Sequence, residues 1–272
     1  MSKQEDRRAR LAHISDLHFG KIVQPGIVSA LVEEINQRDV DVVALSGDLT
    51  QRARHSQYRA AVEMIDSIVP PVVVVPGNHD VYPWWRPVKR IIRPLGRYKQ
   101  YFGGDLKPVF ESGGIFMLGI NSAYGRTIKG GLLARDIHRE VFRHFHRVSD
   151  RRFKVLVLHH HLSKIQALGP HDVARNARRT LKAASRARVD LVLCGHLHVS
   201  HVEPIPVQPA RHQLVIASAG TATSSRGRMS NRDTNFYNII DVFDDHFVIE
   251  ERKYDVEVGG FVTEATREFP RS

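Results

Sequence analysis

Short apolar runs alternate with amphipathic segments over the first two thirds of the chain. Runs rich in Val, Ile and Leu have the length of buried strands, and they predict strands at residues 11–14, 40–45, 72–75, 109–110, 115–120, 155–158, 191–193 and 214–217. Hydrophobic residues at helical spacing predict helices at residues 25–37, 56–68, 133–147 and 176–187. Strands that alternate with such helices are typical of right-handed βαβ units in a parallel sheet.

Two segments depart from this alternation. Residues 81–105 are rich in Trp, Pro and Arg, and we expect them to form a small cap-like helical insertion. Residues 236–254 have the pattern of a β-hairpin that turns at Asp244-Asp245. Because the sequence contains no repeat, low-complexity tract or linker, we predict one α/β domain over residues 1–272, with a mixed sheet or two packed sheets.

Polar clusters follow the predicted strands directly. There are five of them: Asp16-Leu17-His18, Gly47-Asp48, Gly77-Asn78-His79-Asp80, His159-His160-His161 and Gly195-His196-Leu197-His198. Since the ends of strands in open α/β sheets form the crevice where ligands bind, these side chains should converge. Carboxylate oxygens and imidazole nitrogens suit borderline divalent metals. A preference of Asp, Asn and Gly for turns would explain one such cluster, but not five.

Composition and charge narrow the class of protein. With 272 residues, 42% of them hydrophobic, the chain can bury a large core. The single Cys194 excludes an intramolecular disulfide, and the charged first ten residues do not resemble a secretory signal, so we expect a cytoplasmic protein. No apolar run approaches the ~20 residues of a membrane helix. The formal charge of +11 favours an anionic partner without identifying it.

In their types and order, the five clusters resemble those of the calcineurin-like metallophosphoesterases, and the resemblance extends from Leu11 to Tyr254. It implies a four-layer α/β/β/α sandwich, in which two mixed β-sheets pack together and helices flank them. It also implies two divalent metal ions, Mn²⁺ or Fe first, with Zn²⁺ or Mg²⁺ as alternatives. Carried over by position, it assigns one ion to Asp16, His18 and His198, the other to Asn78, His159 and His196, and a bridging role to Asp48.

Two positions depart from the family's pattern. At the triple histidine, the family's ligand is usually the first histidine after the strand, and it is often followed by His-Pro-Pro. Here the first histidine is followed by His-His-Leu. His159 is therefore our first choice, and His160 stays open as an alternative ligand. Many members carry Asp three residues after the bridging carboxylate, where it supports the catalytic histidine. Gln51 stands there in this chain and cannot supply charge, which leaves open what orients His79.

Four residues in or next to the clusters are expected to have roles other than metal binding. In the family, His79 is not a ligand; it would stabilise the transition state or protonate the leaving oxygen. Asp80 precedes a Pro- and Trp-rich segment and could N-cap a helix there. We expect His13 to pack in or support the first strand, and Cys194 to be a small buried hydrophobe rather than a thiolate ligand.

The reaction expected from this resemblance is hydrolysis of phosphodiester bonds by a hydroxide that bridges two metal ions. Asn121-Ser122 and residues 218–222 are similar to the phosphodiesterase branch of the family, which acts on cyclic nucleotides or glycerophosphodiesters. Substrate contacts are expected from the insertion and from a basic loop: Trp84, Trp85, Arg86 and Arg226. The partner is then a small phosphate ester, and the oligomeric state is not predicted.

Three other functions stay open. A nucleotide-sugar or lipid-linked pyrophosphatase would use the insertion to hold an acyl chain or to touch an anionic membrane, which implies a peripheral membrane location. A DNA nuclease fits the positive charge, but the chain leaves no room for a separate DNA-binding or dimerisation domain. A non-catalytic scaffold of the same fold should lack ligands, whereas every ligand position is filled here.

Overall fold

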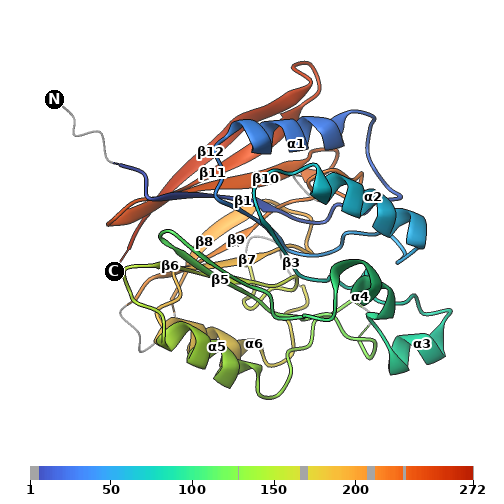
Figure 1. The fold of residues 1–272 in the computed structure, drawn as a ribbon, viewed down its shortest axis with the longest axis horizontal. Helices are drawn as coiled ribbons and strands as arrows, with labels where there is room; N and C mark the ends of the chain where they lie inside the picture. The colour runs from blue at the N-terminus through green and yellow to red at the C-terminus, as the bar shows by residue number, and fades with distance from the viewer. Residues whose placement is uncertain (1–5, 128, 166–170, 207–211, 229–230, 272) are drawn as a thin grey trace.

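Two six-stranded mixed β-sheets make up the centre of the computed structural model, which describes residues 6–127, 129–165, 171–206, 212–228 and 231–271 (Figure 1). The first sheet has the order β12 (Gly260–Pro270), β11 (His246–Asp255), β10 (Phe236–Val242), β1 (Ala9–Ile14), β2 (Val42–Leu45), β3 (Val72–Val74). The second has the order β4 (Val109–Ser112), β5 (Ile115–Gly119), β6 (Phe153–Val157), β7 (Leu191–Cys194), β9 (Leu214–Ser218), β8 (His201–Ile205).

Each sheet combines parallel and antiparallel strands: the antiparallel strands β10, β11 and β12 lie on one side of the first sheet, and β4 and β8 form the two edges of the second. Strands β1, β2 and β3 run parallel in the first sheet, and β5, β6, β7 and β9 run parallel in the second. The central strands β2, β6 and β7 are buried along their whole length, as the continuous apolar runs of parallel strands predict. Their carboxyl ends therefore lie at one edge of each sheet, where the polar clusters follow.

Six helices occur in the described residues: α1 (Ile27–Gln37), α2 (His55–Asp66), α3 (Pro87–Ile92), α4 (Gly96–Phe102), α5 (Ile137–His146) and α6 (Ala177–Arg186). Helices α1 and α2 cover the first sheet, and α5 and α6 cover the second (Figure 1). In α1 the buried residues Ile27, Leu31 and Ile35 recur every four positions and form one apolar stripe. None of the helices described is long and apolar enough to cross a membrane.

The hydrophobic core lies in three layers. One buried cluster fills the space between the first sheet and α1 and α2, a second lies between the two sheets, and a third separates the second sheet from α5 and α6. Phe153 of β6 contacts Phe247 of β11 across the middle layer, with ring centroids 5.0 Å apart. The predicted four-layer α/β/β/α sandwich is confirmed.

Two strands were not predicted. Strand β12 extends the expected hairpin to three antiparallel strands, but it lies at the edge of its sheet, and Phe261 and Phe269 are its only buried residues. Its charged residues hide the strand pattern, as charges commonly do on edge strands. Strand β8 contains Pro204, which an edge strand tolerates.

Candidate metal centre

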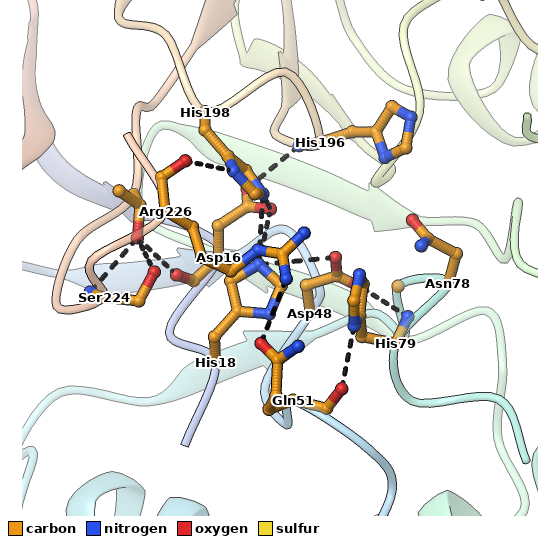
Figure 2. Close-up of polar contacts among 12 residues, drawn as sticks. Asp16, His18, Asp48, Gln51, Asn78, His79, His196, His198, Ser224 and Arg226 are labelled. Atoms are coloured by element: carbon orange, nitrogen blue, oxygen red, sulfur yellow. Dashed lines mark hydrogen bonds and ion pairs between the residues drawn. The ribbon is translucent and has the colours of Figure 1, made fainter. Parts of the chain in front are cut away.

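The five polar clusters meet at the ends of strands from both sheets. Asp16 and His18 follow β1, Asp48 follows β2, Asn78 follows β3, His159 follows β6, and His196 and His198 follow β7. Figure 2 shows most of these side chains directed toward a common space. Their potential ligand atoms form two groups, each with all its atoms within 4.8 Å of one another: Asp16, His18, Asp48 and His198; and His159, His160 and His196.

Left-handed backbone conformations are concentrated at this centre. The described residues include ten non-glycine residues with positive φ, and half of these are predicted ligands: Asp16 (54°), His18 (47°), Asp48 (54°), His196 (71°) and His198 (58°). Such angles are unfavourable for residues with a Cβ and persist where the surrounding structure holds them. The turns after the strands therefore aim successive side chains into the centre.

The first group is tightly packed and almost fully buried. His198 Nε2 lies 3.0 Å from Asp16 Oδ1 and 3.1 Å from His18 Nε2. His18 Nε2 lies 3.5 Å from Asp16 Oδ1 and 3.6 Å from Asp48 Oδ2. Two imidazole nitrogens and two carboxylate oxygens, one from each residue of the group, are thus close enough together to bind one metal ion.

The second group lies on the other side of Asp48. His159 Nε2 is 3.1 Å from Asn78 Oδ1 and 3.4 Å from Asp48 Oδ2. The His196 ring centroid is 5.1 Å from that of His159. Because Asp48 Oδ2 approaches both His18 and His159, it occupies the position between the two groups that a bridging ligand requires.

Main-chain carbonyls determine which histidine nitrogens can bind a metal. His159 Nδ1 donates to the Ser46 carbonyl at 2.8 Å, and His198 Nδ1 donates to the Arg226 carbonyl at 2.7 Å. Since a carbonyl only accepts, Nδ1 carries the hydrogen in both rings. Each Nε2 then faces the centre and can bind a metal through its lone pair once it has lost any proton of its own, as in the histidine ligands of metal sites.

The same reasoning separates His160 from His159. His160 Nε2 donates to the Lys129 carbonyl at 3.1 Å, and its Nδ1 pairs with Ser122 Oγ at 2.8 Å. Both nitrogens of His160 are therefore engaged away from the carboxylates. Its ring remains close to that of His196, with centroids 4.5 Å apart, so it packs against a residue of the second group.

Two buried carboxylate oxygens have no hydrogen-bond donor. Asp16 Oδ2 accepts from Ser15 Oγ at 2.6 Å and from the His196 backbone N–H at 2.9 Å, and Asp48 Oδ1 accepts from the His79 N–H at 2.8 Å. The inward oxygens, Asp16 Oδ1 and Asp48 Oδ2, are buried and unpartnered. An unsatisfied buried carboxylate oxygen is unfavourable. The donor set of carboxylate, amide and imidazole groups around these oxygens therefore fits divalent cations.

Electrostatics within the cluster favour the ionised carboxylates. Burial would raise the pKa of Asp16, but the imidazoles of His198 and His18 hold it well below its usual range. Asp48 behaves in the same way because of His159 and His79. In return, and against the effect of burial, Asp48 raises the pKa of His159 to about 9. A cation that binds here would displace the proton of His159.

Gln51 contacts two residues of the site with different atoms (Figure 2). Its main-chain carbonyl accepts from His79 Nδ1 at 2.8 Å, and its side-chain Oε1 accepts from Arg226 Nη1 at 3.3 Å. The orientation of His79 therefore does not depend on the side chain at position 51. The His79 ring lies edge-on to His18, with centroids 4.8 Å apart, and burial lowers its pKa.

Asp80 does not cap a helix, contrary to our expectation. Helix α3 begins at Pro87, and the buried Asp80 carboxylate instead accepts from the backbone N–H groups of Leu49, Thr50 and Gly77 at 3.0 to 3.1 Å. Burial and the nearby Asp48 raise the pKa of Asp80 to about 7, although these donors oppose the shift. Asp80 thus fastens the loop after β2 to the loop after β3.

His13 and Cys194 contact residues next to the proposed ligands rather than the centre itself. His13 Nε2 pairs with Ser46 Oγ at 2.9 Å, and Ser46 in turn orients His159 through its carbonyl. Cys194 is fully buried beside His161, and burial raises the pKa of its thiol, which disfavours a thiolate. The supporting roles of Ser46 and Ser122 left no signal in the sequence, because each depends on a contact between distant strands.

A cavity of about 290 Å³ opens beside Asn78 and His79. Trp84, Trp85 and Arg226 line it, as expected for substrate contacts, whereas Arg86 is not among its lining residues. The other lining residues are Gln51, Arg52, Val81, Pro83, Arg90 and Lys129. The lining thus contains four basic side chains and no carboxylate, which suits an anionic ligand with an apolar part.

Comparison with known proteins gives one family and one fold. The family model of the calcineurin-like phosphoesterases matches residues 9–200. An uncharacterized metallophosphoesterase of Helicobacter pylori is 26% identical over 208 residues, which cover 73% of this chain and 47% of the relative, so the chain spans about half the length of that protein. A probable cyclic nucleotide phosphodiesterase of a Synechococcus species is 26% identical over 207 residues, covering 71% of this chain and 74% of the relative.

The fold is similar to that of a purple acid phosphatase from yellow lupin seeds, with a TM-score of 0.72 at 14% identity over 98% of this chain and 54% of the other. A dimetal phosphatase from Danio rerio gives a TM-score of 0.58 at 13% identity, covering 95% of this chain and 99% of the other. At these identities the likeness concerns the fold alone.

Proposed function

The chain belongs to the calcineurin-like phosphoesterase family, and we propose that it is a metal-dependent hydrolase that cleaves phosphodiesters at a pair of divalent metal ions. One ion would be held by Asp16, His18 and His198, the other by Asn78, His159 and His196, and Asp48 would bridge them. The observation that carries this proposal is the pair of buried, unpartnered oxygens, Asp16 Oδ1 and Asp48 Oδ2, which face histidine Nε2 atoms.

When bound, the two ions would lower the pKa of a water molecule and neutralise charge on the phosphoryl oxygens. His79 would protonate the leaving oxygen from Nε2, because Nδ1 is committed to the Gln51 carbonyl. Burial lowers the pKa of His79, so the protonated ring is a stronger acid but a smaller fraction of it carries the Nε2 proton near neutral pH. Arg226, held by Gln51, would attract the anionic ester into the cavity.

We propose a nucleotide or glycerol phosphodiester as the substrate, with a cyclic nucleotide as the first candidate. The cavity is at the small end of the usual range for ligand sites, and its two tryptophans offer a surface on which a base could stack. The name of the Synechococcus relative points to the same class. A nucleotide-sugar or lipid-linked pyrophosphate is the second candidate, since four basic side chains could neutralise two phosphates.

A substrate panel with metal-reconstituted protein tests the proposal. We expect bis(p-nitrophenyl) phosphate and 3′,5′-cyclic AMP to be hydrolysed, and p-nitrophenyl phosphate and a nucleotide-sugar diphosphate to react more slowly. Asp48→Asn should abolish hydrolysis without loss of the circular dichroism signal, while Asp66→Asn, at the exposed end of α2, should react as the wild type does. Wild-type activity in Asp48→Asn would overturn the metal assignment. Faster hydrolysis of the nucleotide-sugar diphosphate than of the diesters would show that the substrate is a pyrophosphate rather than a phosphodiester.

A further inference from the structure

Exposed apolar side chains are concentrated in one short segment of the insertion. In the described part of the chain, eleven large hydrophobic residues are exposed, and five of them lie within residues 84–92. They are Trp84 (73% exposed), Trp85 (46%), Val88 (67%), Ile91 (62%) and Ile92 (69%). Helix α3, which carries three of them, buries none of its residues. Exposed apolar clusters of this kind mark interaction surfaces.

The fold holds this segment out from the body rather than leaving it loose. Arg90 turns inward and donates to the carbonyls of Tyr82, Gly125 and Thr127 at 2.5 to 2.9 Å. Leu95 and Tyr98, at the start of and within α4, are buried in the core layer of the first sheet. Figure 1 shows α3 at the periphery, beyond α4. The apolar residues are therefore presented by an anchored element.

The segment that carries these side chains is basic throughout. Residues 81–104 contain six Lys and Arg residues and no Asp or Glu. Arg86, Lys89 and Arg93 are exposed and alternate along the chain with the apolar residues. Apolar side chains surrounded by cations are the composition of segments that lie in the interface of anionic membranes, where tryptophan is favoured.

We propose that this surface, defined as the α3 tip (Trp84, Trp85, Arg86, Val88, Lys89, Ile91, Ile92 and Arg93), docks on an anionic lipid membrane. A second copy of the chain is disfavoured as the occupant, because contact between two such tips would bring cations of both copies together. Nucleic acid would use the cations but would leave Ile91 and Ile92 exposed to water. A lipid surface satisfies both the charge and the apolar side chains.

Docking would place the opening of the cavity at the membrane surface. Trp84 and Trp85 belong both to the α3 tip and to the cavity lining beside His79. The docking proposal does not rest on the proposed function, since it follows from exposure and charge alone. If both hold, esters at or near the membrane would reach the site without crossing bulk solvent.

Both tryptophans of the chain lie in the α3 tip, so intrinsic fluorescence reports on it directly. We expect vesicles of equimolar phosphatidylcholine and phosphatidylglycerol to shift the emission to the blue, and brominated lipid in them to quench it. Vesicles of phosphatidylcholine alone should have a much smaller effect. Added salt should weaken binding without preventing quenching of the bound fraction, because the apolar contacts remain.

Matched variants assign the effect to the tip. Ile91→Ser with Ile92→Ser should weaken co-sedimentation with the anionic vesicles by at least about tenfold, since burial of even part of each isoleucine is lost. Val256→Ser with Val258→Ser, two valines as exposed as Ile91 and Ile92 in the turn between β11 and β12, should bind as the wild type does. Hydrolysis of bis(p-nitrophenyl) phosphate in solution should be equal in all three proteins, which separates docking from catalysis.

Four outcomes would overturn the proposal. The first is equal binding of the wild type to both kinds of vesicle, and the second is binding by the Ile91→Ser, Ile92→Ser variant at wild-type strength. The third is a wild-type dimer that this variant converts to a monomer, which would make the tip an interface between copies. Binding without quenching by brominated lipid would show that other basic regions adsorb to the vesicle, and would count equally against docking through the tip.

Discussion

Gly77→Ala should move the bridging carboxylate of the proposed metal centre. A Cβ built on Gly77 would lie 2.1 Å from Asp48 Oδ1 and 2.3 Å from the Asp48 backbone nitrogen, whereas ordinary contacts begin at 3.4 Å. Because one of the two contacts is to backbone, rotation of the Asp48 side chain cannot relieve it. The loops after β2 and β3 must separate by about 1 Å, and a displacement of this size at a catalytic group is costly for activity.

The size of the effect follows from this displacement. A misplacement of about 1 Å in a catalytic group lowers activity by about 100-fold, and we expect this loss in kcat/KM toward bis(p-nitrophenyl) phosphate. Overpacking in a closely packed region destabilises by about 1–3 kcal/mol, so Tm should fall by several degrees. Bound metal, measured by mass spectrometry, should fall below that of the wild type.

Gly104→Ala provides the matched control. A Cβ at Gly104 meets no atom within 4 Å, and neither glycine has a φ in the left-handed region that disfavours alanine. This variant should keep wild-type activity, Tm and metal content. If Gly77→Ala keeps activity within threefold of wild type while folded, the close approach of the two loops has no role in holding Asp48, and the account of the bridge is wrong.

Three further variants or conditions test other contacts of the site. His159→Gln should remove one bound ion whereas His160→Gln keeps both, since His159 Nε2 faces Asn78 and Asp48 while His160 Nε2 donates to the Lys129 carbonyl; the reverse result would reassign the ligand. Gln51→Asp should raise KM severalfold with little change in kcat, because it would pair with Arg226 while the main-chain carbonyl still orients His79; a fall in kcat alone would contradict this. Burial lowers the pKa of His13 to about 3, below the unfolded value of 6.5, so stability is fully present above pH 6.5 and is lost as the pH falls toward 3. Urea unfolding of metal-free protein should give about 1 kcal/mol less stability at pH 5.5 than at pH 7 from this residue, and His13→Gln should lose correspondingly less; equal losses in the two proteins would refute the assignment.

The layered fold and the meeting of the polar clusters could be predicted from the sequence. Apolar runs identified the central parallel strands, and residues that follow such strands lie at a common edge. Strand β12 could not be identified in this way, because an edge strand needs few buried residues and its charges obscure the alternation. The helix starts were accurate to within a few residues, as in α1, which begins at Ile27 rather than at position 25.

Contacts made by the main chain account for most of what the sequence did not predict at the site. Gln51 raised doubt about His79 because its side chain lacks charge, yet the contact is made by its carbonyl. Asp80 was expected to act locally, as N-caps do, but its partners Leu49 and Thr50 lie about 30 positions earlier in the chain. The tautomers of His159 and His160 likewise depend on carbonyls that no motif encodes.

Metal stoichiometry, measured together with diesterase activity, tests the central claim most directly. Metal-free protein titrated with Mn²⁺ should bind two ions per chain, and hydrolysis of bis(p-nitrophenyl) phosphate should require both. Asp48→Asn, which alters the residue shared by the two groups, should bind fewer ions and lose hydrolysis. Full activity of the wild type with one ion bound, or after complete removal of metal by a chelator, would contradict the account.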